Sequence, residues 1–240
     1  MKLKIMTFNI QHGVNHNESL KGNKDVIELE KDAAHINNYN CDIIGLNEVR
    51  GAGEHPDYTD QAKLLGKLTN REYFFGKAIA IPGKGLYGNA FLTQIPVKSA
   101  EIIPIPDSVI EEEGRYESRS VIKAVVDAGK DITLFISHFG LMPSEQKNAV
   151  KTLITEAKKV NTPVIFMGDL NMTPDNEISK PLYEEFNEAF GESNQNSFPS
   201  HDPSIKIDYI FLSKDIKIQS AQVAEKVVSD HCALIAEIEL

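Results

Sequence analysis

Residues 163–171 read Pro-Val-Ile-Phe-Met-Gly-Asp-Leu-Asn, a short apolar run that ends directly in a polar turn. Four consecutive apolar residues between turn residues are typical of a strand buried on both faces. The turn that follows, Gly168-Asp169-Leu170-Asn171, contributes a carboxylate and an amide at the end of that strand. Because loops at strand ends carry chemistry on a rigid frame, the stretch predicts both a central strand and part of a site.

The same arrangement occurs at five other places along the chain. Short polar clusters lie at or near the ends of strand-like runs, except the last, which lies just before one. They are Thr7-Phe8-Asn9, Asn47-Glu48-Val49-Arg50, Ser137-His138, Ile207-Asp208-Tyr209 and Ser229-Asp230-His231. In packed sheets such ends can converge, so the clusters predict one site assembled from distant parts of the chain.

Each cluster alone also has an ordinary structural interpretation. Asn9 can be a strand-end turn residue, Glu48 can form a surface ion pair with Arg50, and His138 can be a satisfied core histidine. Asp208 is harder to dismiss, since a carboxylate within an apolar run must find a partner. Six such clusters together favour a functional site over six coincidences.

The hydrophobic pattern predicts many strands and few helices. Strands are predicted over 2–10, 42–49, 73–81, 90–93, 97–105, 120–127, 132–138, 163–167, 206–212, 216–223 and 232–240, and helices over 25–38, 60–68, 144–160 and 181–189. The order of these elements favours two packed, mainly antiparallel sheets flanked by helices.

Composition limits the possible classes of protein. The chain has 240 residues and no linker-like stretch, which predicts one domain over residues 1–240. No apolar run reaches the length of a membrane span, and the two cysteines lack metal-site spacing, so a cytoplasmic protein is expected. The net charge of −10 weighs against a binder of duplex DNA that relies on a basic face.

The order T-F-N, N-E-V, S-H, G-D-L-N, I-D-Y-I-F and S-D-H resembles the endonuclease/exonuclease/phosphatase superfamily. The resemblance extends from Thr7 to His231, and G-D-x-N and S-D-H are its most specific parts. It implies a DNase-I-like fold, a four-layer α/β sandwich, and hydrolysis of phosphate esters that depends on Mg²⁺ or Mn²⁺. Members include nucleases, inositol polyphosphate phosphatases and sphingomyelinases.

The resemblance also implies roles for individual residues. Metal binding is expected of Glu48 and Asp230, and substrate binding of Asn9, beside the metal and the phosphate. Catalytic roles are expected of His138, Asp169, Asn171, Asp208 and His231. The glycine-rich segment 83–88 resembles the turn before a core strand in this superfamily, which predicts that Asn89 faces the cleft.

The expected chemistry needs these residue types. Mg²⁺ prefers oxygen ligands and keeps several waters, so one or two carboxylates suffice to hold it. The attacking water needs a base, which either Asp169 or a His231 oriented by Asp208 can provide. His138 can protonate the leaving group or donate to a phosphoryl oxygen.

These observations lead to one reaction class and two classes of substrate. The first expectation is a metal-dependent phosphodiesterase that is nuclease-like in mechanism. The alternative is an enzyme acting on a small-molecule or lipid-headgroup phosphate. It is favoured by the net negative charge, by Gln11, whose neutral side chain is a poor ligand for a hard cation, and by His138, which resembles a histidine of the sphingomyelinase branch. A non-catalytic binding module ranks below both, and no obligate protein partner is expected.

A few residues outside the motifs also have an expected role or location. Arg115 and Arg119 precede a strand and can bind phosphate, although a solvated surface charge is the ordinary interpretation. Four other histidines match no motif and are expected at the surface; they are His12, His16, His35 and His55.

Overall fold

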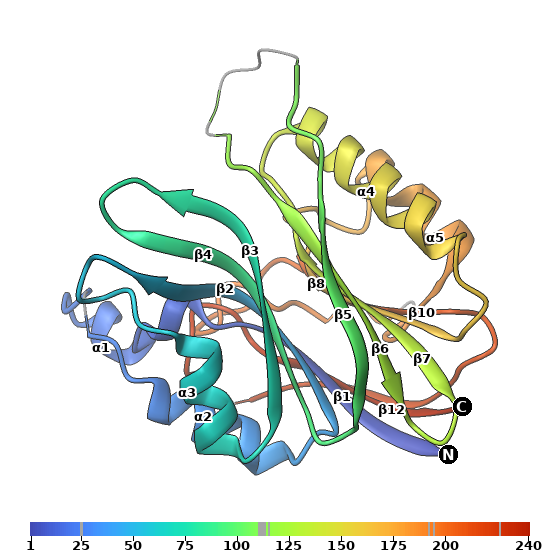
Figure 1. Ribbon diagram of the computed structural model, residues 1–240, viewed down its shortest axis with the longest axis horizontal. Coiled ribbons are helices and arrows are strands. Elements are labelled where there is room, and N and C mark those ends of the chain that lie inside the picture. The colour runs from blue at the N-terminus through green and yellow to red at the C-terminus, as the bar shows by residue number, and fades with distance from the viewer. Residues whose placement is uncertain (25, 110–113, 115, 192, 194, 226) are drawn as a thin grey trace.

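Two packed β-sheets form the centre of the protein, and helices cover their outer faces (Figure 1). The computed structural model describes residues 1–24, 26–109, 114, 116–191, 193, 195–225 and 227–240. The described part of the chain contributes six strands to each sheet, in the orders β11-β12-β1-β2-β4-β3 and β5-β6-β7-β8-β10-β9.

The strands of the first sheet are β1 (Lys2–Asn9), β2 (Ile43–Gly53), β3 (Glu72–Ile81), β4 (Gly85–Thr93), β11 (Lys217–Val223) and β12 (Leu234–Glu239). Those of the second are β5 (Val97–Pro104), β6 (Ser120–Asp127), β7 (Asp131–His138), β8 (Val164–Asp169), β9 (Asn187–Glu188) and β10 (Asp208–Leu212). The helices are α1 (His16–Leu20), α2 (Leu29–Tyr39), α3 (Gln61–Thr69), α4 (Pro143–Ala157) and α5 (Lys180–Glu185), with 3-10 turns η1 (Gln11–Gly13) and η2 (Glu177–Ser179).

Each sheet has one parallel pair near its centre. Strands β1 and β2 are parallel, as are β7 and β8, and the other paired strands are antiparallel. The four-layer sandwich of two mainly antiparallel sheets is therefore confirmed. The parallel pairs matter for the site because parallel strands end at the same edge of a sheet.

Alternation along the strands divides the apolar side chains between two sides. On β1, Leu3 and Ile5 belong to the cluster between the sheets, whereas Met6 and Phe8 pack beneath α2. On β8, Ile165 and Met167 lie between the sheets, and Phe166 packs with the residues of α4. Both sheets are thus covered on both faces, as the continuous apolar run at 164–167 indicated.

A few boundaries differ from the prediction. The helix expected over 25–38 spans Leu29–Tyr39, and Asp25 lies outside the described residues. The helix expected over 181–189 stops at Glu185, and Asn187–Glu188 instead form the edge strand β9. Pairing with β10 thus decides the conformation of this segment, which periodicity alone did not distinguish from helix.

Two further observations concern the whole chain. Among the described residues, no helix is long and apolar enough to cross a membrane. Cys41 and Cys232 are buried free thiols.

Candidate active site

The predicted site residues at strand ends point between the two sheets. Because side chains alternate along a strand, Asn9 of β1 and His138 of β7 face the same way as the core residues between the sheets. Asp169 of β8 and Asp208 of β10 do so as well. Register places them side by side: His138 lies opposite Asp169, and Asp208 also lies opposite Asp169. The predicted convergence of strand ends is therefore present in the fold.

Glu48 reaches the site through an irregularity in β2. Simple alternation would direct it away from Asn47, to the outer face of the sheet. The register between β2 and β4 shifts between Leu46 and Val49, and Glu48 has a φ of 58°. A bulge of this kind re-aims a side chain. The strained backbone turns the Glu48 carboxylate into the cleft, where Asn9 Nδ2 donates to its Oε1 at 3.0 Å.

Asp169 lies at the centre of the site and both its oxygens are engaged. The backbone N–H of Asn171 donates to Oδ1 at 2.9 Å, and Asn9 Nδ2 donates to Oδ2 at 3.1 Å. Burial and then the charge of Asp208 raise the pKa of Asp169 to about 7, although His231 and the hydrogen bonds oppose the shift. A carboxyl with that pKa can take or release a proton near neutral pH.

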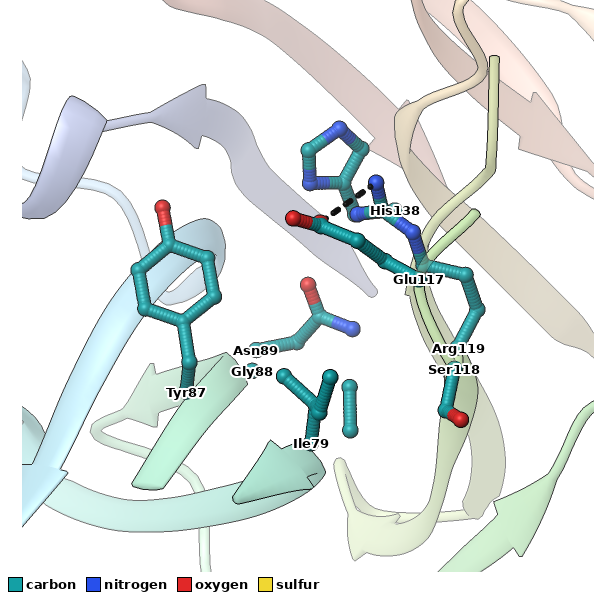
Figure 2. Close-up of a pocket in the computed structure, with 9 residues that line it drawn as sticks. Ile79, Tyr87, Gly88, Asn89, Glu117, Ser118, Arg119 and His138 are labelled. Carbon is teal, nitrogen blue, oxygen red and sulfur yellow. Dashed lines mark hydrogen bonds and ion pairs between the residues drawn. The ribbon is translucent and has the colours of Figure 1, made fainter. Parts of the chain in front are cut away.

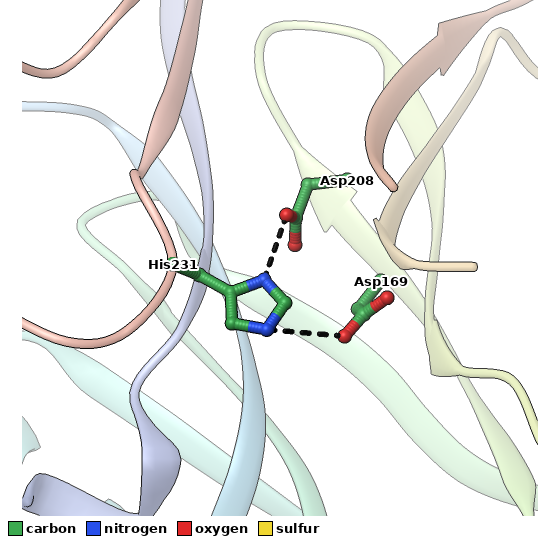
Figure 3. Close-up of side chains that lie close together, drawn as sticks. All are labelled: Asp169, Asp208 and His231. Carbon is green, nitrogen blue, oxygen red and sulfur yellow. Dashed lines mark hydrogen bonds and ion pairs between the residues drawn. The ribbon is translucent and has the colours of Figure 1, made fainter. Parts of the chain in front are cut away.

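His231 lies between two carboxylates (Figure 3). Its Nδ1 is 2.8 Å from Asp208 Oδ2, and its Nε2 is 3.7 Å from Asp169 Oδ2. Burial alone would lower the pKa of His231, but Asp208 and Asp169 outweigh burial and raise it to about 10. At neutral pH the ring is therefore an imidazolium. The ring of Phe198 packs against it at 4.8 Å between centroids.

His138 differs from His231 in charge. Burial, followed by the positive charges of Arg119 and His231, lowers the pKa of His138 well below its usual value. The neutral ring lets Nε2 accept a hydrogen bond, and Asn171 Nδ2 lies 3.0 Å from it. At neutral pH, His138 is thus uncharged and His231 is positively charged, a difference that the sequence did not reveal.

The acidic residues expected to bind metal fit a divalent cation. Glu48 and Asp230 both line the cleft, and among the described residues neither has a lysine or arginine in an ion pair. Burial raises the pKa of Asp230, and the negative charge of Glu48 adds to the shift. Uncompensated carboxylates in one cleft suit a hard cation.

Asp169, Asp208 and His231 also lie close enough to surround a metal ion. Their hydrogen bonds argue against that use. His231 Nδ1 is engaged with Asp208 Oδ2, and the two oxygens of Asp169 accept hydrogen bonds from Asn171 and Asn9. Glu48 and Asp230 are therefore the better candidates.

Three residues near the site were not assigned from the sequence. Asn47 Oδ1 accepts the backbone N–H of Asp169 at 2.9 Å, which connects the two sheets. The Tyr87 hydroxyl donates to Glu48 Oε2 at 2.8 Å and lies 3.4 Å from His12 Nδ1. His12 and its neighbour Gln11 both have a left-handed backbone, with φ 46° and 44°.

The expectation that the four unassigned histidines lie at the surface is wrong for three of them. His12 is half-buried and lines the cleft, whereas His16 and His35 are buried. His35 lies on the face of α2 that packs against the first sheet, beside Phe8. His55 is exposed as predicted.

Asn89 and Arg119 line a small pocket that adjoins the cleft (Figure 2). Asn89 is buried, accepts from Asn47 Nδ2 at 2.9 Å and donates to the carbonyl of Ser120 at 3.3 Å. Arg119 is not the solvated charge of the ordinary interpretation, because its side chain is only 11% exposed and pairs with Glu117 at 3.1 Å. Arg115 lies outside the described residues.

The cleft has a volume of about 820 Å³. The described residues that line it include four cations, Arg50, Lys84, Arg119 and the His231 imidazolium, and four acids, Glu48, Glu117, Asp169 and Asp230. Apolar side chains such as Leu141, Met172, Ile205 and Ile207 line part of the remaining wall, beside polar ones such as Thr173 and Asn176. This arrangement suits one phosphate held by a cation, next to an uncharged group.

Comparisons with known proteins identify the family of this chain. The model of the endonuclease/exonuclease/phosphatase family matches residues 6–231, whereas no curated protein matches the chain. An endonuclease/exonuclease/phosphatase from Bacteroides vulgatus is 20% identical, with 100% of this chain and 99% of that chain covered and a TM-score of 0.79.

Two other solved structures share the fold at low identity. A mannosyl-6-phosphatase from Bacteroides thetaiotaomicron VPI-5482 is 15% identical over 99% of this chain and 100% of that chain, with a TM-score of 0.79. The human Nocturnin catalytic domain with bound sulfate anion is 17% identical over 99% and 94%, with a TM-score of 0.72. The family match spans nearly the whole chain, and the protein therefore belongs to the endonuclease/exonuclease/phosphatase family of hydrolases.

Proposed function

We propose that the protein is a divalent-metal-dependent phosphoesterase in which an activated water attacks phosphorus. The observation that supports this most strongly is the buried chain of Asp208, His231 and Asp169 at the base of the cleft. It joins a protonated imidazole, which can neutralise charge, to a carboxyl whose pKa of about 7 suits proton transfer. Phosphate ester hydrolysis needs both functions.

Of the two candidate bases, the electrostatics favour Asp169. His231 is protonated at neutral pH, so it donates hydrogen bonds and offsets the charge that develops on the phosphoryl oxygens. Asp169, held by Asn9 and Asn171, can accept the proton of the water. Asn171 Nδ2 donates to the Phe139 carbonyl at 3.1 Å and lies 3.0 Å from His138 Nε2, so Asn171 would orient His138 beside the reacting phosphate.

Glu48 and Asp230 would hold the metal, with the Glu48 carboxylate oriented by Asn9 and Tyr87. A bound Mg²⁺ or Mn²⁺ would supply charge neutralisation at the phosphate. The carboxylate oxygens of Glu48 and Asp230 suit either ion. The cytoplasm remains the expected location.

The charge of the cleft favours a small phosphate ester over a nucleic acid. A nucleic-acid groove follows several phosphates with excess lysine and arginine. Here the acids match or exceed the cations among the described lining residues. A sugar phosphatase shares this fold, so the fold accommodates small substrates.

The proposal is tested by measuring hydrolysis of a panel of phosphate esters in the presence of Mg²⁺ or Mn²⁺. The panel holds sugar phosphates, inositol phosphates, sphingomyelin, an aryl phosphomonoester, an aryl phosphodiester, RNA, and single- and double-stranded DNA. We expect turnover of a small ester that chelator and Asp169→Ala both abolish. Steeply salt-dependent cleavage of DNA would instead support the nuclease-like expectation. Turnover that persists in chelator would contradict the metal dependence.

A further inference from the structure

Apolar side chains at one edge of the second sheet line the cleft. Strands β7 and β8 end at this edge and β10 begins there, as the register between them shows. The segments next to these strand ends contribute Leu141, Met172 and Ile207 to the cleft wall. A backbone bond joins two of these segments, since the N–H of Leu170 donates to the carbonyl of Ile207 at 2.8 Å. The three side chains therefore belong to one side of the cleft.

The segment before β10 extends this side. Phe198 and Ile205 also line the cleft, and their backbones pair as an isolated antiparallel bridge. The ring of Phe198 packs against the ring of His231, with 4.8 Å between centroids. The apolar surface thus begins directly beside a reacting group. We name it the apolar edge, and its members are Leu141, Met172, Phe198, Ile205 and Ile207.

Two members of the apolar edge are left largely in water. Leu141 is 53% exposed and Ile205 is 39% exposed, whereas Met172 and Ile207 are buried beneath them in the wall. Exposed apolar side chains that adjoin one another and a polar site mark a place where an apolar group binds. Covering them gains free energy in proportion to the area removed from water. The cleft, at about 820 Å³, is within the usual size of pockets for small organic ligands.

Polar side chains on the same side are already bonded within the protein. Thr173 Oγ1 donates to Asp175 Oδ1, and Asn176 Oδ1 accepts from the backbone N–H of Ile178 at 3.0 Å. A sugar or an inositol is recognised through its hydroxyl groups, which lose free energy when they are buried without partners. These local bonds leave few partners for hydroxyl groups here. This side of the cleft therefore favours a carbon group without hydroxyls.

The other side of the cleft is charged. The first sheet and its β3–β4 hairpin contribute Glu48, Arg50 and Lys84 to the lining. These groups suit a phosphate and its metal rather than an apolar group. A phosphate ester has the same division, with charge at one end and carbon at the other. The cleft can thus hold such an ester in one orientation, with its carbon group against the apolar edge.

We propose that the apolar edge binds the carbon group of the substrate, and that the preferred substrates are phosphate esters of alkyl or aryl alcohols rather than of sugars or inositol. The inference rests on the function proposed above and narrows its substrate class. Leu141 and Ile205 are the members to test, because their exposure lets them be replaced with little effect on the core.

The experiment uses ethyl, butyl and hexyl phosphate with Mg²⁺. Hydrolysis adds one water across the bond between phosphorus and the ester oxygen and gives inorganic phosphate and the alcohol, so released phosphate reports turnover. Wild type should gain at least about twofold in kcat/KM per added methylene, since full burial of one methylene corresponds to roughly fourfold. The matching alkyl 4-nitrophenyl phosphates extend the series to diesters.

A second comparison separates carbon from hydroxyl groups. Hexyl phosphate and glucose 6-phosphate are both primary phosphate esters with six carbons, and they differ in their hydroxyl groups. Wild type should prefer hexyl phosphate in kcat/KM by at least about tenfold, because the hydroxyl groups would be buried without partners. Preference for glucose 6-phosphate would overturn the proposal.

Variants assign the preference to the apolar edge. Leu141→Ser and Ile205→Ser should each lower the ratio of kcat/KM for the hexyl ester to that for the ethyl ester by at least about threefold. A loss of folded enzyme lowers both values and leaves this ratio unchanged. Leu141→Met keeps an apolar side chain and should hold the ratio within about twofold of wild type.

The matched control is Ile102→Ser. Ile102 on β5 is 39% exposed, as Ile205 is, but it does not line the cleft. Thermal melting checks the folding of each variant. Ile102→Ser should leave both the ratio and kcat/KM for the ethyl ester within about twofold of wild type, as expected for a surface change remote from the site.

Calorimetric binding of ethylphosphonate and hexylphosphonate provides a measurement without turnover. With Mg²⁺ present, wild type should bind hexylphosphonate at least about tenfold more tightly, and Leu141→Ser should lose at least about threefold of that difference. Equal binding of the two phosphonates, or a ratio unchanged in both serine variants, would overturn the proposal. If no ester is hydrolysed, the proposed function fails, and the phosphonates still decide whether the apolar edge binds a carbon group.

Discussion

Replacing Asp208 with asparagine removes the charge that keeps His231 protonated while nearly preserving shape. His231 Nδ1 lies 2.8 Å from Asp208 Oδ2, and both side chains are almost fully buried. The folded-state pKa of His231 is about 10, against 6.5 for an unperturbed histidine. At about 1.4 kcal/mol per pKa unit the difference corresponds to about 5 kcal/mol. Measured losses from breaking a buried ion pair are about 3–5 kcal/mol, and we expect a loss in that range.

The loss should depend on pH with a definite sign. Because the folded pKa of His231 lies above its unfolded value, its stabilisation is complete below pH 6.5 and is lost as pH rises through about 10. The difference in unfolding free energy between wild type and Asp208→Asn should therefore be largest near pH 6. It should be about half as large near pH 8 and close to zero near pH 10.

Urea denaturation at pH 6, 8 and 10 measures these differences, and NMR titration of the His231 ring nitrogens measures the pKa directly. Asp57→Asn is the matched control, because Asp57 faces His55 at 3.5 Å in a pair that is exposed on both sides. It should cost at most about 1 kcal/mol. A pH-independent loss in Asp208→Asn, or an unchanged pKa of His231, would refute the reasoning.

Four other predictions follow from the site. Glu48→Gln should lower Mn²⁺ affinity by at least about tenfold in calorimetry with an unchanged melting temperature; unchanged affinity would remove Glu48 from the metal site. Tyr87→Phe, which leaves one Glu48 oxygen without its donor, should weaken Mn²⁺ binding by about tenfold, and equal affinity would show that the hydroxyl does not orient Glu48. Gly168→Ala should destabilise by more than about 3 kcal/mol in urea, because φ is 156° and the added Cβ would lie 1.8 Å from a carbonyl oxygen of β7; wild-type stability would contradict this. The kcat/KM profile should rise through about pH 7 as Asp169 loses its proton and fall through about pH 10 as His231 does, and a flat profile would exclude both roles.

Much of the fold was predictable because its signals are local. Strands that are buried on both faces, such as 164–169, are continuous apolar runs whatever their partners are. Segment 187–188 was wrongly predicted as helix for the opposite reason. It is a strand because β10 pairs with it, and that pairing has no local signal.

The same distinction applies to the site. Asn9, His138, Asp169 and Asp208 were predictable because each occupies a terminal inward position of a strand, the last in β1, β7 and β8 and the first in β10, and alternation is a property of the strand itself. Their order along the chain was sufficient to indicate the family. His12 and Tyr87 were not predictable, because their roles come from proximity to Glu48 rather than from a pattern of their own.

Local sequence patterns therefore specified all the strands except β9, the two-sheet class and the set of polar groups at the strand ends. Tertiary structure alone decided the direction of Glu48, since the bulge depends on how β2 pairs with β4. It also decided that His231 is charged and His138 neutral, since burial and neighbouring charges set the pKa of each ring. Packing between the sheets also brought Arg119 beside Asn89 and His138, which are far from each other in sequence.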